Sequence, residues 1–193
     1  MNLYTLDLDK FDLEYLRTKL IRDYTDDDIK KMTEAYSIEL LTPKVPQMLF
    51  TTKSVSMLLN FAKCKKCGRC CLPDKTLQGN PGVIVNEADL LRISKDTKHS
   101  LKSLKKMTMI NRNPDYQVGA KYLPLPCIFF NKNERICKIY SDRPFVCRIY
   151  PVLDAPNNGV SIDVHCEYGK EIFQKAMKYT RALAMQKPTS YNT

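Results

Sequence analysis

The sequence lacks the long apolar runs and the glycine-rich motif that mark several common protein classes. No apolar stretch approaches the roughly 20 residues needed to span a bilayer, so we expect no membrane association. Residues 1–9, MNLYTLDLD, have neither a basic start nor an apolar core, so we expect no secretory signal and a cytoplasmic protein. The 6 glycines form no G-x-G-x-x-G, so no ordinary nucleotide-binding unit is visible.

Cysteine is too scarce for a small disulfide scaffold. The chain has 8 cysteines in 193 residues, about 4%, whereas such scaffolds exceed roughly 8–10%. A chain of this length can bury a core without bridges, and a protein that is not exported meets reducing conditions. Its 44% hydrophobic and 27% charged residues are ordinary for a globular protein. We therefore expect the cysteines to be ligands and not bridges.

Charge is distributed unevenly along the chain. Residues 1–50 contain 7 Lys/Arg and 10 Asp/Glu, a net charge of −3, although the whole chain carries +10. The remainder, which bears all the cysteines, therefore carries +13. Such an excess suits an acidic protein partner or nucleic acid, although basic residues close to thiolates can also serve the sulfurs themselves.

The N-terminal part, residues 1–47, reads as a two-helix extension. Leu13, Leu16 and Leu20 fall on one helical face. Thr25 is followed by three aspartates, which is typical of an N-cap with an acidic first turn. Pro43 then ends the second helix.

The remaining sequence predicts short strands and short helices. Residues 82–85 read as a strand, and Asn86 and Ser100 each precede a helical stretch. Residues 122–151 read as short strands and turns, followed by a strand at 160–164 and a helix from about residue 169. We predict an α+β fold: a small, irregular, metal-stapled cysteine domain over 48–170, with a C-terminal helix and tail over 171–193.

The cysteines form an ordered set that begins with C-x-x-C-x-x-C-C. The eight candidate metal ligands are Cys64, Cys67, Cys70, Cys71, Cys127, Cys137, Cys147 and Cys166. C-x-x-C places two thiolates at one turn, and the longer run is similar to the start of the bacterial ferredoxin pattern, in which cysteines hold a four-iron cluster. The same soft thiolates also suit tetrahedral zinc, so the ligands do not choose between the two metals. Two four-thiolate sites, or one cluster with a few structural cysteines, both remain open.

The vicinal pair in this set carries an expectation of its own. Side chains of neighbouring residues diverge in most backbone conformations. We therefore expect Cys70 and Cys71 not to bind one metal ion together.

Basic and aromatic residues accompany the later cysteines. Arg143 and Arg148 lie inside the cysteine-bearing turns, where a positive charge favours the thiolate form. Tyr140 and Tyr150 occupy equivalent places in C-K-I-Y and C-R-I-Y, so we include these four residues as candidate cofactor-binding residues. His165, beside the last cysteine, could be a nitrogen ligand, an acid–base group or a buried histidine.

The eight ordered cysteines, together with R-P-x-x-C-R-x-Y-P at residues 143–151, give the sequence a family resemblance. Over roughly residues 60–170 it resembles the CxxCxxCC family of zinc- or iron-chelating proteins, the YkgJ-like cysteine cluster proteins. The resemblance implies that the eight cysteines bind an iron–sulfur centre, of the 4Fe-4S type, or zinc. The family is also similar to flagellin lysine N-methylases, in which a four-iron cluster and S-adenosylmethionine are implicated. The chain lacks the C-x-x-x-C-x-x-C spacing of radical S-adenosylmethionine enzymes.

Three functions follow as hypotheses. The first is an iron–sulfur protein with a redox or methyl-transfer role, its cluster held mainly by Cys64, Cys67 and Cys70 with a fourth ligand from the later cysteines. The second is a zinc-stabilised module that binds an acidic protein or nucleic acid. The third is an S-adenosylmethionine-dependent protein lysine methylase. Whether the protein is an enzyme stays open at this point.

Overall fold

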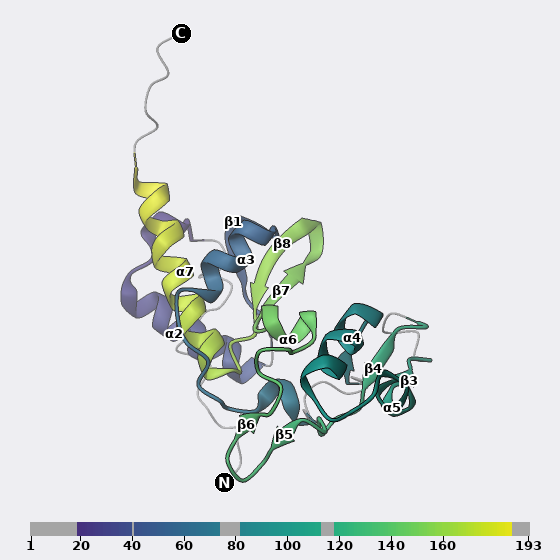
Figure 1. Cartoon of the computed structure of the whole chain (residues 1–193). Coiled ribbons are helices and arrows are strands. Elements are labelled where there is room, and N and C mark those ends of the chain that lie inside the picture. The colour runs from purple at the N-terminus through teal and green to yellow at the C-terminus, as the bar shows by residue number, and fades with distance from the viewer. Residues whose placement is uncertain (1–18, 40, 74–81, 113–117, 187–193) are drawn as a thin grey trace. The chain divides into compact units, whose positions relative to one another are not determined.

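The computed structural model describes residues 19–39, 41–73, 82–112 and 118–186 of the chain. These residues form six α-helices and small antiparallel sheets (Figure 1), which confirms the predicted α+β class. Most of the predicted first helix, with Leu13 and Leu16, lies outside the described residues. None of the helices in the described ranges is long and apolar enough to cross a membrane.

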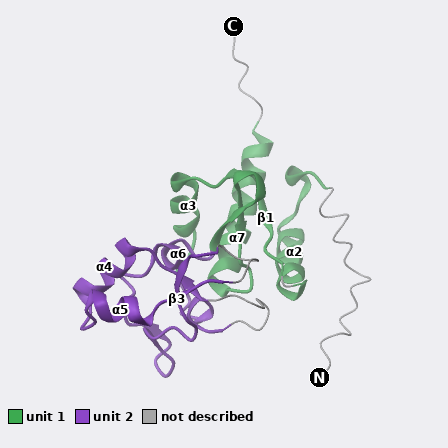
Figure 2. Cartoon of the chain, turned by 90° about the vertical axis from the view of Figure 1, so that its right-hand side faces the viewer, with its two compact units in different colours: residues 1–63, 152–193 green, residues 64–151 purple. Residues whose placement is uncertain are grey.

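The chain divides into two compact units (Figure 2). The first unit comprises residues 1–63 and 152–193, and the second comprises residues 64–151. The predicted ranges 1–47, 48–170 and 171–193 divide the chain at other points. The second unit is therefore one continuous segment inserted between two segments of the first.

The first unit contains a three-stranded antiparallel sheet with helices. Its elements are α2 (Asp26–Glu39), β1 (Lys44–Leu49), α3 (Thr52–Leu59), β7 (Val152–Ala155), β8 (Gly159–Ile162) and α7 (Glu167–Met185), with 3-10 turns η2 (Ile21–Asp23) and η4 (Pro156–Asn158). The strand order is β1-β8-β7, so β8 is central, and Val45 pairs with Val160. Phe173 and Ile172 of α7 and Leu58 of α3 are completely buried. The long helix α7 contacts α2, α3, β1 and β8 and so holds this unit together.

The second unit is built from shorter elements. They are η3 (Arg69–Cys71), β2 (Val83–Ile84), α4 (Glu87–Asp96), α5 (Leu101–Met107), β3 (Met109–Ile110), β4 (Lys121–Leu123), β5 (Phe130–Asn131), β6 (Ile136–Cys137) and α6 (Phe145–Ile149). β2, β4 and β3 form one antiparallel sheet, and β5 and β6 form a hairpin. A hydrophobic cluster that includes Leu90, Leu104 and Phe129 is buried in this unit, and Cys127, Cys137 and Cys147 pack against it.

Local capping explains why three helices begin where the sequence predicts. The Thr25 hydroxyl accepts from the Asp28 N–H (3.1 Å), and an Asp28 carboxylate oxygen accepts from the Thr25 N–H (2.7 Å). Asn86 and Asp89 make the same reciprocal pair at the start of α4. The Ser100 hydroxyl accepts from the Ser103 N–H at the start of α5. These bonds satisfy amides that have no partner inside the helix, so the predicted helix starts are confirmed.

Candidate metal centre

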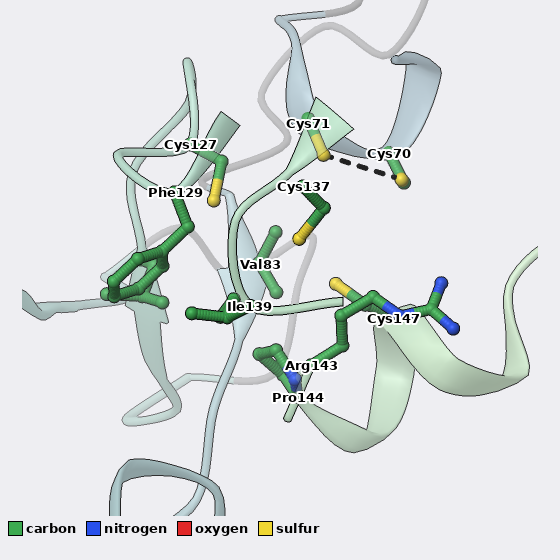
Figure 3. A pocket seen from close by; sticks show the side chains of 11 residues that line it. Cys70, Cys71, Val83, Cys127, Phe129, Cys137, Ile139, Arg143, Pro144 and Cys147 are labelled. Atoms are coloured by element: carbon green, nitrogen blue, oxygen red, sulfur yellow. Dashed lines mark hydrogen bonds between the residues drawn. The ribbon is translucent and has the colours of Figure 1, made fainter. Parts of the chain in front are cut away.

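Five cysteines of the second unit line one small cavity (Figure 3). They are Cys70, Cys71, Cys127, Cys137 and Cys147. They come from four places in the chain: the turn η3, the loop before β5, strand β6 and helix α6. Most of the remaining wall is apolar, and the enclosed volume is about 10 Å³, close to that of one water-sized sphere.

The loop that carries the first cysteines turns sharply. Lys66 and Gly68 both adopt left-handed backbone angles, with φ of 55° and 80°. The Gly68 carbonyl then accepts from the Cys71 and Leu72 amides, which closes the turn η3. The Cys71 carbonyl accepts from the Cys127 amide at 2.8 Å, so the backbone joins the first cysteine cluster to the second.

The vicinal cysteines do not diverge. Their sulfurs lie 3.6 Å apart (Figure 3). The tight 3-10 turn brings these neighbours together, so the expectation of divergent side chains is wrong. In a tetrahedral zinc site with Zn–S bonds of about 2.3 Å, two sulfurs are separated by about 3.8 Å. The pair can therefore contribute to one metal site.

Hydrogen bonds link the sulfurs of Cys70, Cys71 and Cys137 and shift their pKa values. Hydrogen bonds to Cys137 and Cys70, together with burial, raise the pKa of Cys71 far above its ordinary value. The hydrogen bond from Cys71 lowers the pKa of Cys137 to about 6 and also lowers that of Cys70. The hydrogen bonds among these three sulfurs thus favour the thiol form of Cys71 and the thiolate forms of Cys70 and Cys137.

Cys127 and Cys147 are the other two cysteines at the cavity, and both are shielded from water. Burial raises the pKa of both Cys127 and Cys147. Arg143 acts in the opposite direction, because its positive charge favours the thiolate forms of Cys70, Cys137 and Cys147. A bound cation would favour the same forms more strongly, since thiolates and not thiols bind metals.

Arg143 is held at the cavity by its own turn. Its Nε donates to the Tyr140 carbonyl at 2.8 Å, and its guanidinium lies 3.7 Å from the centre of the Tyr140 ring. Arg143 lines the cavity with the five cysteines (Figure 3), and its cofactor-binding role stays a prediction. Tyr140, Arg148 and Tyr150 are not among the residues that line the cavity, and their cofactor-binding role stays a prediction.

Cys64 and Cys67 belong to the same unit but do not line the cavity. Cys67 lies close enough to Cys70 to raise its pKa by charge repulsion. Arg135, from the β5–β6 hairpin, donates to the Cys67 carbonyl at 2.7 Å and to the Lys66 carbonyl at 3.4 Å. Sequence reasoning missed Arg135, because it lies in a polar turn with no motif around it.

Asp89 fixes the turn that precedes α6. This buried carboxylate accepts from the Phe145 amide (3.0 Å) and from Arg92 (2.8 Å), and Arg92 also donates to the Arg143 carbonyl (2.7 Å). Helix α4 thereby holds the segment that presents Arg143 and Cys147 to the cavity.

Replacing Asp89 by alanine is expected to lower the free energy of unfolding by about 2 kcal/mol, because several buried donors lose their acceptor. Urea unfolding of the metal-loaded protein measures this. Glu87→Ala is the control, because Glu87 is on the same helix but makes an exposed ion pair with Lys105, which contributes little. Equal effects of the two substitutions would contradict the role given to Asp89.

Cys166 and His165 belong to the first unit. Cys166 is 2% exposed and directly precedes α7. The His165 side chain is 9% exposed, and its Nδ1 lies 3.0 Å from an Asp163 carboxylate oxygen, while its Nε2 has no hydrogen-bond partner within the described part of the chain. That Cys166 is a metal ligand stays a prediction.

The donor set fits a soft metal, although the sulfurs do not converge on a ready-made ion site. In the described ranges, no three His, Cys, Asp or Glu side chains are arranged to hold an ion directly. Five thiols around one cavity nevertheless suit zinc or iron, and the second unit contains two further cysteines. The residues present therefore fit a thiolate-bound metal centre.

A comparison with protein-family models shows which family the chain belongs to. Residues 63–175 match the CxxCxxCC family, described as a "putative zinc- or iron-chelating domain". The chain belongs to this family. The match includes all eight cysteines, so this member of the CxxCxxCC family is a metal-binding cysteine-cluster protein. Searches of curated proteins and of solved structures gave no match. The similarity to flagellin lysine N-methylases is not shown by these comparisons.

Proposed function

We propose that residues 64–151 hold an iron–sulfur cluster and that the protein has a redox role. The observation that carries this proposal is the gathering of five cysteine sulfurs around one cavity. A single zinc ion and a four-iron cluster each take four thiolates, so the number of sulfurs does not separate the two. Ligands of a multi-iron cluster surround a body several atoms wide, so they need not converge on one point.

The protein's own residues would set the properties of such a centre. When bound, an iron–sulfur cluster supplies a site that accepts and releases an electron. Arg143 places a positive charge beside it, which favours the reduced, more negative state. Val83, Phe129 and Ile139 limit the access of water.

A single zinc ion is the second candidate, favoured by the 3.6 Å separation of the Cys70 and Cys71 sulfurs. Zinc has no redox chemistry, so the second unit would then be a zinc-stabilised binding module. Methyl transfer from S-adenosylmethionine has less support, because the chain has neither a G-x-G-x-x-G motif nor the C-x-x-x-C-x-x-C spacing of radical S-adenosylmethionine enzymes.

Anaerobic purification, followed by measurement of iron, acid-labile sulfide, zinc and the visible spectrum, tests the proposal. We expect about four iron and four sulfide per chain, with a broad visible absorption that bleaches on reduction. Stoichiometric zinc without sulfide would overturn the iron–sulfur proposal and support the second candidate. The spectrum is then recorded with S-adenosylmethionine, and no perturbation is expected.

A further inference from the structure

The net charge of the protein resides entirely in its second unit. Residues 64–151 contain 17 Lys/Arg and 7 Asp/Glu, a net charge of +10, whereas the first unit contains 14 of each and is neutral. Zinc bound by four thiolates adds a charge of only about −2. The sulfurs therefore use little of this excess, and most of it remains for a polyanionic partner.

Two exposed aromatic rings lie within the cysteine-bearing part of this unit. Tyr140 is 49% exposed and Phe145 is 50% exposed. The guanidinium of Arg143 lies 3.7 Å from the Tyr140 ring centre, and that of Arg148 lies 5.9 Å from the Phe145 ring centre. The Arg143 guanidinium covers one face of the Tyr140 ring, which leaves the other face for stacking, while the Phe145 ring lies beside the more distant Arg148 charge.

Hydrogen bonds to the backbone fix the segment that carries Phe145 and Arg143. The Phe145 amide donates to buried Asp89, and the Arg143 carbonyl accepts from Arg92. Cys147, two residues beyond Phe145, lines the metal cavity. An aromatic side chain on such a fixed backbone loses little entropy when a flat ligand stacks on it.

We propose that this unit binds single-stranded nucleic acid through the 138–148 strip, defined as Lys138, Tyr140, Arg143, Phe145 and Arg148. Bases stack on exposed aromatic rings, and cations contact the phosphates between them. An acidic protein could use the positive charge and could also pack against Phe145, but the pairing of exposed rings with guanidinium groups matches the alternation of bases and phosphates, which favours nucleic acid. Asp142 is the acidic residue within the strip and limits its charge.

The binding of a fluorescein-labelled dT15 oligonucleotide to the metal-loaded full chain, followed by fluorescence anisotropy, tests this proposal. We expect dT15 to bind more tightly than a 15-base-pair duplex, with an affinity that falls as salt rises. Phe145→Leu keeps the apolar volume but removes the ring, and is expected to weaken dT15 binding about tenfold. Lys138→Gln is expected to reduce the dependence on salt.

Matched substitutions in the neutral unit serve as controls. Tyr179, 41% exposed, and Lys30 are exposed residues of α7 and α2. Tyr179→Leu and Lys30→Gln are expected to leave dT15 binding unchanged. If Phe145→Leu has no more effect than Tyr179→Leu, or if polyglutamate competes as well as unlabelled dT15, the proposal is overturned.

Metal content is measured for every variant, so that loss of the ring is not confused with loss of the centre. The exposed side chain of Phe145 does not line the cavity, and we expect Phe145→Leu to keep its metal. The strip requires a folded unit but not a particular metal. Failure of the nucleic-acid proposal would therefore leave the iron–sulfur proposal intact, and the reverse also holds.

Discussion

Replacing Cys71 by serine is expected to remove most of the bound metal and to unfold residues 64–151. Cys71 is 6% exposed, and its thiol contacts the sulfurs of both Cys70 and Cys137. A structural four-thiolate site contributes about 10–16 kcal/mol, so one ligand accounts for about 3 kcal/mol, or more than a hundredfold in metal affinity. The unit has only short strands and a modest hydrophobic cluster to replace that stabilisation.

Metal content and urea unfolding of Cys71→Ser and Cys137→Ser measure this effect. Cys166→Ser, in the first unit, is expected to keep its metal, because residues 64–151 hold the proposed centre; a loss of metal equal to that of Cys71→Ser would instead support the prediction that all eight cysteines are ligands. Full metal content with an unchanged unfolding midpoint would show that the substituted cysteine is not a ligand.

Gly68→Ala is expected to destabilise the protein by about 2–5 kcal/mol. Gly68 has a φ of +80°, where an L-residue costs about 1–2 kcal/mol. An added Cβ would also lie 2.7 Å from the ring of Phe130, and such overpacking costs about 1–3 kcal/mol more. Because Gly68 closes the turn η3, the variant should also bind metal more weakly.

Gly119→Ala provides a matched control within the same unit. Its φ is +81°, but an added Cβ would meet nothing within 4 Å. This variant therefore carries only the backbone cost of about 1–2 kcal/mol and should keep its metal affinity. Urea unfolding of both variants separates the two effects. Equal destabilisation would mean that Phe130 moves aside freely.

Helix starts could be predicted from the sequence because capping is local. Thr25, Asn86 and Ser100 each bond an amide only three residues ahead. Strand β1, in contrast, could not be predicted, because it contains Pro46, which disfavours a strand, and because its partner β8 comes only after the whole of the second unit along the chain. Helix α6 was also missed, because five residues are too few to show a helical period.

Spacing could single out the cysteines as candidate ligands, but it could not give the geometry of the site. It also pointed to Arg143, which lines the cavity, while its role there stays a prediction. The contact between the sulfurs of Cys70 and Cys71 depends on backbone angles that a spacing pattern does not encode. Arg135 supports the first cysteine loop from a distant hairpin, which only the folded structure reveals.

The insertion of the second unit within the first has a consequence for the order in which the protein is made. During synthesis, residues 64–151 emerge complete before β7, β8 and α7 exist. Strand β1 therefore has no partner until β8 has been synthesised. The second unit, by then complete, is already able to bind its metal. Metal loading can therefore precede closure of the three-stranded sheet. Without metal, we expect the sheet to close around an inserted segment that is not yet folded.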